Sequence, residues 1–288
     1  MLDDVLLQGF LVGGLYGLIA LGFVIVFKSS QVLNLAYGEM ILVLAYLLYF
    51  LLDSIGLPLW LGVLLIFAAG AGMGLLMERA FIRPLIGQPF FSILVLTLML
   101  MFLFKGLVVL TWGGETFHYD FAHMHMIRFG GTQVLPAALW SFVVAIFIFL
   151  LLTFLFRYTK IGLAMRVVST SQTIAQSLGI TVKRIFSLSW LVSGMFAAIC
   201  AILLGSVYMV DTGMGDIGLG KGLVVVLIGG LNSLPGALAG GLILGLVESL
   251  GGYYWAELTQ VMPWLLMLFI LLVRPWGLFG EMRRIERI

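Results

Sequence analysis

The sequence of 288 residues has few charged side chains, because aspartate, glutamate, lysine and arginine together make up 10% of it and hydrophobic residues 62%. A soluble domain needs a polar surface, and these charged residues are too few to provide one. The mean hydropathy of +1.20 therefore excludes a soluble fold. Cysteine is scarce as well, since Cys200 stands alone in an apolar segment. This excludes an intramolecular disulfide, and we expect Cys200 to pack in the interior.

Apolar runs of about 20 residues recur from one end of the chain to the other, and this length crosses a roughly 30 Å hydrocarbon core. They predict helices, because a segment in lipid must satisfy its own backbone hydrogen bonds. The first run follows Asp3 and Asp4. Acidic residues are unlike the basic start of a cleavable signal, so we expect this run to remain as a helix. The predicted segments are about 9–27, 32–52, 58–77, 91–111, 137–156, 185–208, 217–231, 235–252 and 260–274.

The predicted fold class is all-α: a polytopic transmembrane helical protein with about eight to nine spanning or re-entrant helices, forming a single transmembrane domain over 1–288. The segments 217–231 and 235–252 are short, so they cross twice or form a re-entrant hairpin. Either choice leaves the same orientation, in which the N-terminus is outside and the C-terminus cytoplasmic by the positive-inside rule. One set of loops holds 12 of the 15 basic residues: Lys28, Arg79, Arg83, Arg157, Lys160, Arg166, Lys183, Arg184, Arg274, Arg283, Arg284 and Arg287.

A polar island, 157–184, lies in one of these cytoplasmic loops and contains the stretch VVSTSQTIAQSLGI. Its pattern predicts two short helices, with Ser171 as the cap of the second. Ile174 and Leu178 then share one helix face, and Gly179 ends the turn. Such a surface suits docking of another protein. A solvated connector lying on the membrane is the alternative.

Several stretches of the chain carry a family resemblance. They are RYTKIGLAMRVVSTSQTIAQSLGI, VVVLIGGLNSLPGALAGGLILGLVE, LLVRPWGLFG, LNLAYGEM and ERAFIRPL. Together and in this order they resemble inner-membrane permeases of the branched-chain amino acid ABC importer family, of the first-permease type. The resemblance covers most of the chain and weakens between about 112 and 135. It implies a type II-like ABC importer permease, multi-pass in the bacterial cytoplasmic (inner) membrane.

The resemblance also implies a role for the island 157–184, because the matching stretch in such permeases docks on the ATP-binding subunit. This sequence has Ser171 where the family usually has an acidic residue at the start of the second helix. Serine keeps the capping chemistry but removes a charge. The implied ATPase-coupling residues are Gly162, Ala164, Arg166, Ser171, Ala175, Leu178 and Gly179.

Polar residues inside the apolar segments are candidates for the translocation path. Asn34, Tyr37 and Glu39 lie early in the second segment, near its cytoplasmic end, and Glu248 lies late in another. A carboxylate facing lipid at mid-span costs roughly 2.5 to 3.5 kcal/mol on insertion scales, so these groups should face protein or water. A purely structural role for Glu39, paired with Lys28 or a helix end, is the alternative.

The region 213–252 holds 13 glycines and is broken by Asn232 and Ser233. Its small-xxx-small spacings predict close packing of helix backbones. Interrupted helices are also where transporters expose backbone groups to solute. We therefore expect the translocation path to pass this broken-helix region, near Asn232 and Ser233.

Four other kinds of site are not expected in this chain. GDIGLGKG, 215–222, is similar to a phosphate-binding loop, but Gly222 replaces the Ser or Thr that would hold magnesium, so this chain should bind no ATP. His118, His123 and His125 of the external loop lack a cysteine partner, and a metal site is not expected. They suit loop polar groups or contacts with an external partner. Neither a nucleophile with its base nor a basic nucleic-acid stripe is present in the sequence.

The expected function is that of the membrane permease subunit of an ATP-driven importer of a branched-chain or other small amino acid. By resemblance, its partners are a homologous second permease, two cytoplasmic ATP-binding subunits that hold ATP and Mg²⁺, an external solute-binding protein and membrane lipid. Short amides and urea stay open as substrates, and so does pairing with an identical copy. The alternative is an ion-coupled secondary transporter or channel that uses Glu39 and Glu248. A membrane scaffold without transport ranks last.

Overall fold

The computed structural model describes residues 2–119, 127–129 and 132–280. Nearly all of this part is helical, which confirms the all-α prediction, and a helix covers most of each predicted apolar segment, although the second begins at Tyr37 rather than at residue 32. Within the described residues, seven helices are long and apolar enough to cross a membrane. A short antiparallel hairpin pairs Ile127 with Val134.

The first helices are α1 Leu2–Ser30, α2 Tyr37–Tyr49 and α3 Leu59–Leu76. A π-helical turn Phe50–Ser54 follows α2, and a π-helical turn Met77–Ile82 and a 3-10 turn Arg83–Leu85 follow α3. The next two helices are α4 Phe90–Trp112 and α5 Pro136–Tyr158. The remaining elements are β1 Ile127–Phe129, β2 Thr132–Val134, α6 Lys160–Thr170, α7 Gln172–Ser177, α8 Val182–Val207, α9 Met214–Gly229, α10 Leu234–Tyr254, a 3-10 turn Ala256–Leu258 and α11 Met262–Val273.

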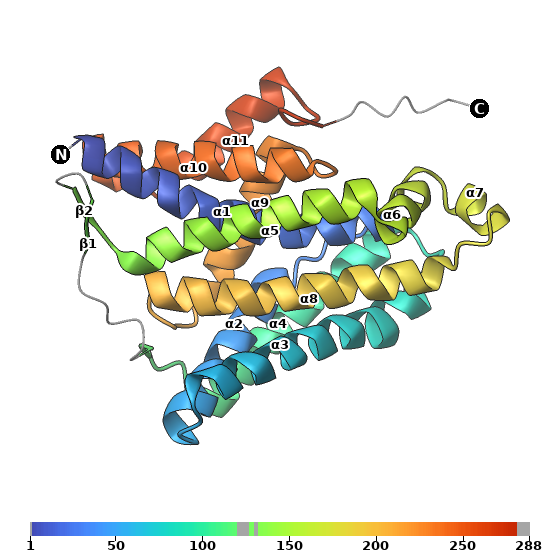
Figure 1. The fold of residues 1–288 in the computed structure, drawn as a ribbon, viewed down its shortest axis with the longest axis horizontal. Coiled ribbons are helices and arrows are strands. Elements are labelled where there is room, and N and C mark those ends of the chain that lie inside the picture. The colour runs from blue at the N-terminus through green and yellow to red at the C-terminus, as the bar shows by residue number, and fades with distance from the viewer. Residues whose placement is uncertain (1, 120–126, 130–131, 281–288) are drawn as a thin grey trace.

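The first helix is the centre of the bundle, and α10, α8, α5 and α9 pack around it (Figure 1). Glycines allow α1 and α10 to approach closely. A Cβ atom added at Gly13 would lie 2.7 Å from the carbonyl oxygen of Gly241, and Gly245 faces the backbone of the same α1 turn. The small-xxx-small spacing predicted for α10 therefore serves backbone packing against α1.

The outer helices carry large apolar side chains on their exposed faces. Leu110 of α4, Phe147 of α5 and Phe269 of α11 are each more than half exposed. A soluble protein rarely exposes such extensive apolar surface. This surface is the one that a bilayer covers.

Two segments depart from a simple set of crossing helices. In Figure 1, α9 runs across the direction of α1, α5, α8 and α10, whereas α10 lies along α1. Of the two short predicted segments, only the second therefore runs along the bundle. The chain also turns back after α1 through Gln31, which has a left-handed backbone (φ 57°). The ring of Tyr37 then packs edge-on against Phe23, with centroids 4.8 Å apart, so α2 begins beside the last third of α1.

The loops rich in basic residues gather at one end of the bundle. Lys28, Thr170 and Phe279 line one pocket there, and Arg79, Lys160 and Arg184 line another. The start of α1 and the β1–β2 hairpin lie at the opposite end (Figure 1). This separation is the one that the positive-inside rule predicts, and the end with α6 and α7 is the cytoplasmic one.

Candidate functional site

The two short helices α6 and α7 form a capped pair that stands out from the bundle at its cytoplasmic end (Figure 1). The hydroxyl of Thr159 accepts a hydrogen bond from the Gly162 amide at 3.1 Å, and the hydroxyl of Ser171 accepts one from the Ile174 amide at 3.3 Å. Gly179, with φ +77°, ends the pair. The predicted capping role of Ser171 is confirmed.

The predicted coupling residues divide into an inner and an outer set. Gly162 and Ala175 are buried, and a Cβ atom at Gly162 would collide with the backbone of Phe156. Because both residues are buried, they do not contact a partner protein. They help to position the pair instead, and Gly162 packs α6 against the end of α5. Arg166, Leu178 and Gly179 are exposed, and Ala164 is half-buried.

Two further apolar side chains belong to the outer surface. Leu163 and Ile174 are 55% and 56% exposed, beside Leu178 at 66%. Ile174 lies four residues before Leu178, and this i, i+4 spacing predicts from the sequence alone that the two side chains share one helix face. We call Leu163, Ile174 and Leu178 the apolar coupling surface. Docking of another protein on these three exposed side chains stays a prediction.

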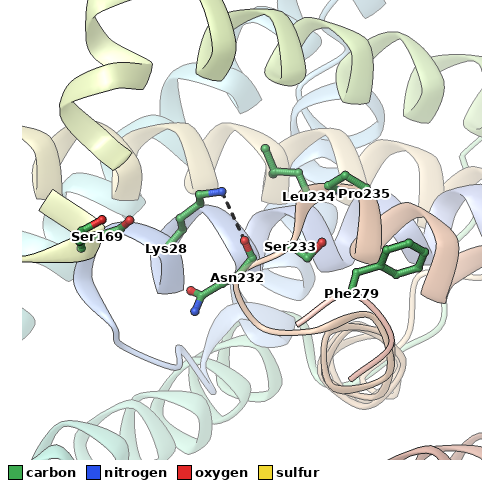
Figure 2. Close-up of a pocket in the computed structure, with 8 residues that line it drawn as sticks. Lys28, Ser169, Asn232, Ser233, Leu234, Pro235 and Phe279 are labelled. Carbon is green, nitrogen blue, oxygen red and sulfur yellow. Dashed lines mark hydrogen bonds between the residues drawn. The ribbon is translucent and has the colours of Figure 1, made fainter. Parts of the chain in front are cut away.

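The coupling helices meet the broken-helix region at a cytoplasmic pocket of about 490 Å³. Figure 2 shows Ser169 of α6 on one side of it and Asn232 and Ser233 of the α9–α10 turn on the other. Lys28 at the end of α1 reaches between them and donates a hydrogen bond to the Asn232 carbonyl oxygen at 3.3 Å. The end of α6 and the turn that joins α9 to α10 therefore line the same pocket.

Glu39 lies in a different place, beside the start of α9. Its carboxylate fills the space that Gly215 leaves free, because a Cβ atom at Gly215 would lie 2.5 Å from the Glu39 carboxyl carbon. Among the described residues its Oε2 atom has no hydrogen-bond partner. Lys105 of α4 and Asp216 of α9 form an ion pair at 2.7 Å nearby. The suggested pairing of Glu39 with Lys28 is wrong, since Lys28 lies at the α9–α10 turn.

Glu248 of α10 forms an ion pair with Lys221 of α9. Both side chains are more than four-fifths buried. The Lys221 ammonium also lies 5.7 Å from the ring centroid of Tyr16 on α1, and the Tyr16 hydroxyl meets the Tyr208 hydroxyl at 3.1 Å. Four polar side chains from four parts of the chain thus meet inside the bundle, and among the described residues the Glu248 Oε2 atom has no hydrogen-bond partner.

The six residues predicted for the translocation path fall in three places. Asn34 serves the turn before α2, where its side-chain oxygen accepts a hydrogen bond from the Ala36 amide at 3.1 Å. Ser233 caps α10 by accepting a hydrogen bond from the Gly236 amide at 3.0 Å. Tyr37 packs on α1, as described above. Glu39 and Glu248 are the two whose carboxylates enter charged clusters, and contact with a solute stays a prediction for all six.

Two further polar groups, around Glu78 and around His118, lie outside the sites described so far. Glu78, fully buried, accepts two hydrogen bonds from Arg83 at 2.9 Å each and one from the Ser187 hydroxyl at 2.9 Å, which fastens the end of α3 to α8. Apart from the charges themselves, no sequence pattern pointed to this cluster. On the external side, His118 lines a small pocket with Asp53 and Tyr119. His123 and His125 lie outside the described residues.

The sequence profile described as "Branched-chain amino acid transport system / permease component" matches residues 5–271. The chain belongs to this family. It is thus an ABC transporter permease of the branched-chain amino acid family, a multi-pass membrane protein and a transport subunit rather than an enzyme.

Several proteins of known name are similar to this permease over most of its length. The high-affinity branched-chain amino acid transport system permease protein LivH of Escherichia coli is 28% identical, over 95% of this chain and 94% of its own. BraD of Pseudomonas aeruginosa, a permease protein of the same description, is 28% identical over 96% and 95%. The fructose import permease protein FruF of Bifidobacterium longum is 28% identical over 81% and 66%. A solved structure, PsaBC from Streptococcus pneumoniae in complex with Fab, superposes with a TM-score of 0.49 at 14% identity, covering 94% of this chain and 90% of that one.

Proposed function

We propose that this permease is one membrane half of an ATP-driven importer that carries a branched-chain or other small amino acid into the cytoplasm of a bacterial cell. The observation that carries the proposal is the apolar coupling surface. Leu163, Ile174 and Leu178 are more than half exposed on a capped helix pair at the basic end of the bundle, outside the helices long enough to cross a membrane. An exposed apolar surface of this kind suits docking of a cytoplasmic subunit.

The proposed complex contains two cytoplasmic ATP-binding subunits, an external solute-binding protein and a second permease, homologous or identical. ATP and Mg²⁺ belong to the ATP-binding subunits in this proposal. The segment GDIGLGKG of this chain forms the first half of α9 and packs against α2 and α1 through Gly218 and Gly222. A glycine also stands where a phosphate-binding loop needs a hydroxyl for magnesium.

In this proposal, movement of α6 is transmitted to the residues around Glu39 and Glu248. Closure of the ATP-binding subunits pulls on α6 and α7, and the pocket around Lys28 passes this movement to Asn232 in the α9–α10 turn. α9 carries Gly215, beside Glu39, at one end and Lys221, paired with Glu248, further along. A shift of α9 therefore changes both clusters together.

The proposed path lies along the face that bears Lys105 and Asp216. Their side chains are 33% and 63% exposed although both belong to helices of the bundle. Charged groups at membrane depth face water or protein rather than lipid. We place the second permease across from this face, with the solute passing between the two.

The substrate follows from the named relatives. LivH and BraD are permease proteins of branched-chain amino acid transport, and FruF is one of fructose import. The two amino acid relatives align with nearly the whole chain, which favours an amino acid. Leucine and fructose are the two substrates to compare first.

Co-purification with the candidate ATP-binding subunits tests this function. Leu178→Asp and Ile174→Asp should each abolish retention of a subunit that the parent permease retains. Ile55→Asp is the matched control, since Ile55 is also apolar and 51% exposed but lies in the turn after α2, at the opposite end. If no ATP-binding subunit is retained by the parent, or if both variants retain it, the importer proposal fails and transport driven by a proton or sodium gradient through Glu39 becomes the leading explanation.

A further inference from the structure

A second pocket at the cytoplasmic end, of about 540 Å³, is rimmed by three cations. Arg79 comes from the turn that follows α3, Lys160 begins α6 and Arg184 lies in the first turn of α8. All three are exposed, and among the described residues none of them forms an ion pair. The neighbouring carboxylate of Glu78 is already occupied by Arg83.

The floor of this pocket is aliphatic. Leu75 of α3 and Leu188 and Leu191 of α8 line it, and all three are partly exposed. Ile161, the second residue of α6, adds a side chain that is 53% exposed. The floor continues along α3 and α8 away from the cations, toward the part of both helices that crosses the membrane.

The combination of rim and floor restricts what can occupy the pocket. A small inorganic anion satisfies the three cations but leaves the leucine side chains in water. An apolar peptide covers the leucines but leaves three cations without a counter-charge. A phospholipid with an anionic headgroup satisfies both, because its phosphate and its acyl chain are joined in one molecule, and basic pockets between helices on the cytoplasmic side suit such headgroups.

We propose that this pocket binds an anionic phospholipid of the cytoplasmic leaflet, with its phosphate among Arg79, Lys160 and Arg184 and an acyl chain along Leu188 and Leu191. The lipid joins the first residue of α6 to α3 and α8, and thereby holds the base of the coupling helices against the bundle. The proposal depends on which end of the bundle is cytoplasmic and is independent of ATP-driven import.

Lipid titration of the purified permease, followed by native mass spectrometry, tests the proposal. Phosphatidylglycerol should bind well below the concentration at which phosphatidylcholine binds. Neutralising one of the three cations should weaken phosphatidylglycerol binding about fivefold, and the triple variant Arg79→Gln/Lys160→Gln/Arg184→Gln on the order of a hundredfold. The control is Arg157→Gln/Lys183→Gln, which removes two exposed cations of the same cytoplasmic loop that do not line the pocket and should leave binding unchanged.

Further arms keep the test decisive. Arg79→Lys/Arg184→Lys preserves the charges and should retain phosphatidylglycerol, which separates loss of the site from loss of the fold. Equal binding of phosphatidylcholine and phosphatidylglycerol, or unchanged binding by the triple glutamine variant, overturns the proposal. Displacement of the lipid by millimolar inorganic phosphate also overturns it in favour of a free-anion site. Unchanged lipid binding together with lost retention of an ATP-binding subunit reassigns the three cations to the protein partner.

Discussion

Replacing Lys221 by methionine removes one half of the ion pair that joins α9 to α10. Both side chains are mostly buried, at 18% and 19% exposure for Lys221 and Glu248. Removing one partner of a buried pair costs about 3–5 kcal/mol, since the remaining charge stays buried without compensation. The residual exposure favours the lower end, so we expect Lys221→Met to lower the free energy of unfolding by about 3 kcal/mol.

Glu248→Gln should cost a similar amount, because it leaves the Lys221 ammonium without its carboxylate. The double variant removes both charges, and a pair replaced by uncharged residues of similar size is often close to neutral. We therefore expect Lys221→Met/Glu248→Gln to lose about 1 kcal/mol, far less than the summed losses of about 6 kcal/mol.

Equilibrium unfolding in mixed detergent micelles, applied to the parent, both single variants and the double variant, measures this coupling. The expected losses correspond to a coupling energy of about 5 kcal/mol, and a measured value clearly above zero confirms that the two groups act as a pair. Additive losses in the double variant would refute the reasoning, since each side chain would then be stabilised by something other than its partner.

The remaining predictions concern packing, capping and a second ion pair. Gly245→Val should prevent stable folding because Gly13 lies against it, whereas Gly72→Ala, with open space around it, should keep or slightly raise the unfolding free energy; a thermal melt compares the two. Ser171→Ala should cost about 1 kcal/mol and speed amide hydrogen exchange in α7, while Ser171→Asp keeps the cap and should not. Arg83→Ala should lower the unfolding free energy by about 3 kcal/mol because it strands the buried carboxylate of Glu78, and Arg83→Ala/Glu78→Gln should recover much of that loss in the same measurement.

Helix positions and the capping of α7 were predictable from sequence because they depend on local signals. Long apolar runs require helices in lipid, and a serine followed by a short apolar pattern marks a helix start. The predicted contact between the glycines of α10 and another helix followed from their spacing. The identity of the partner helix, α1, did not, because Gly9, Gly13 and Gly17 lie more than 200 residues away in the chain.

The surroundings of Glu39 and Glu248 could not be predicted from the sequence, because they depend on how distant segments pack together. Lys221 lay at the rim of a predicted segment, and nothing in its neighbourhood pointed to Glu248 on the next helix. Glu39 was expected near the cytoplasmic surface, but the turn at Gln31 sends the chain back along α1, so that Glu39 lies beside Gly215. The crossing direction of α9 is likewise a property of packing, since its sequence resembles any short apolar helix.

Solute uptake by the reconstituted complex tests the central claim most directly. The permease, its candidate second permease, the ATP-binding subunits and the solute-binding protein are placed in proteoliposomes, and uptake of radiolabelled leucine and of fructose is followed with ATP or with a non-hydrolysable analogue. The account predicts leucine uptake that requires both hydrolysable ATP and the binding protein and falls to background with Leu178→Asp. Uptake that proceeds without ATP under an ion gradient contradicts it.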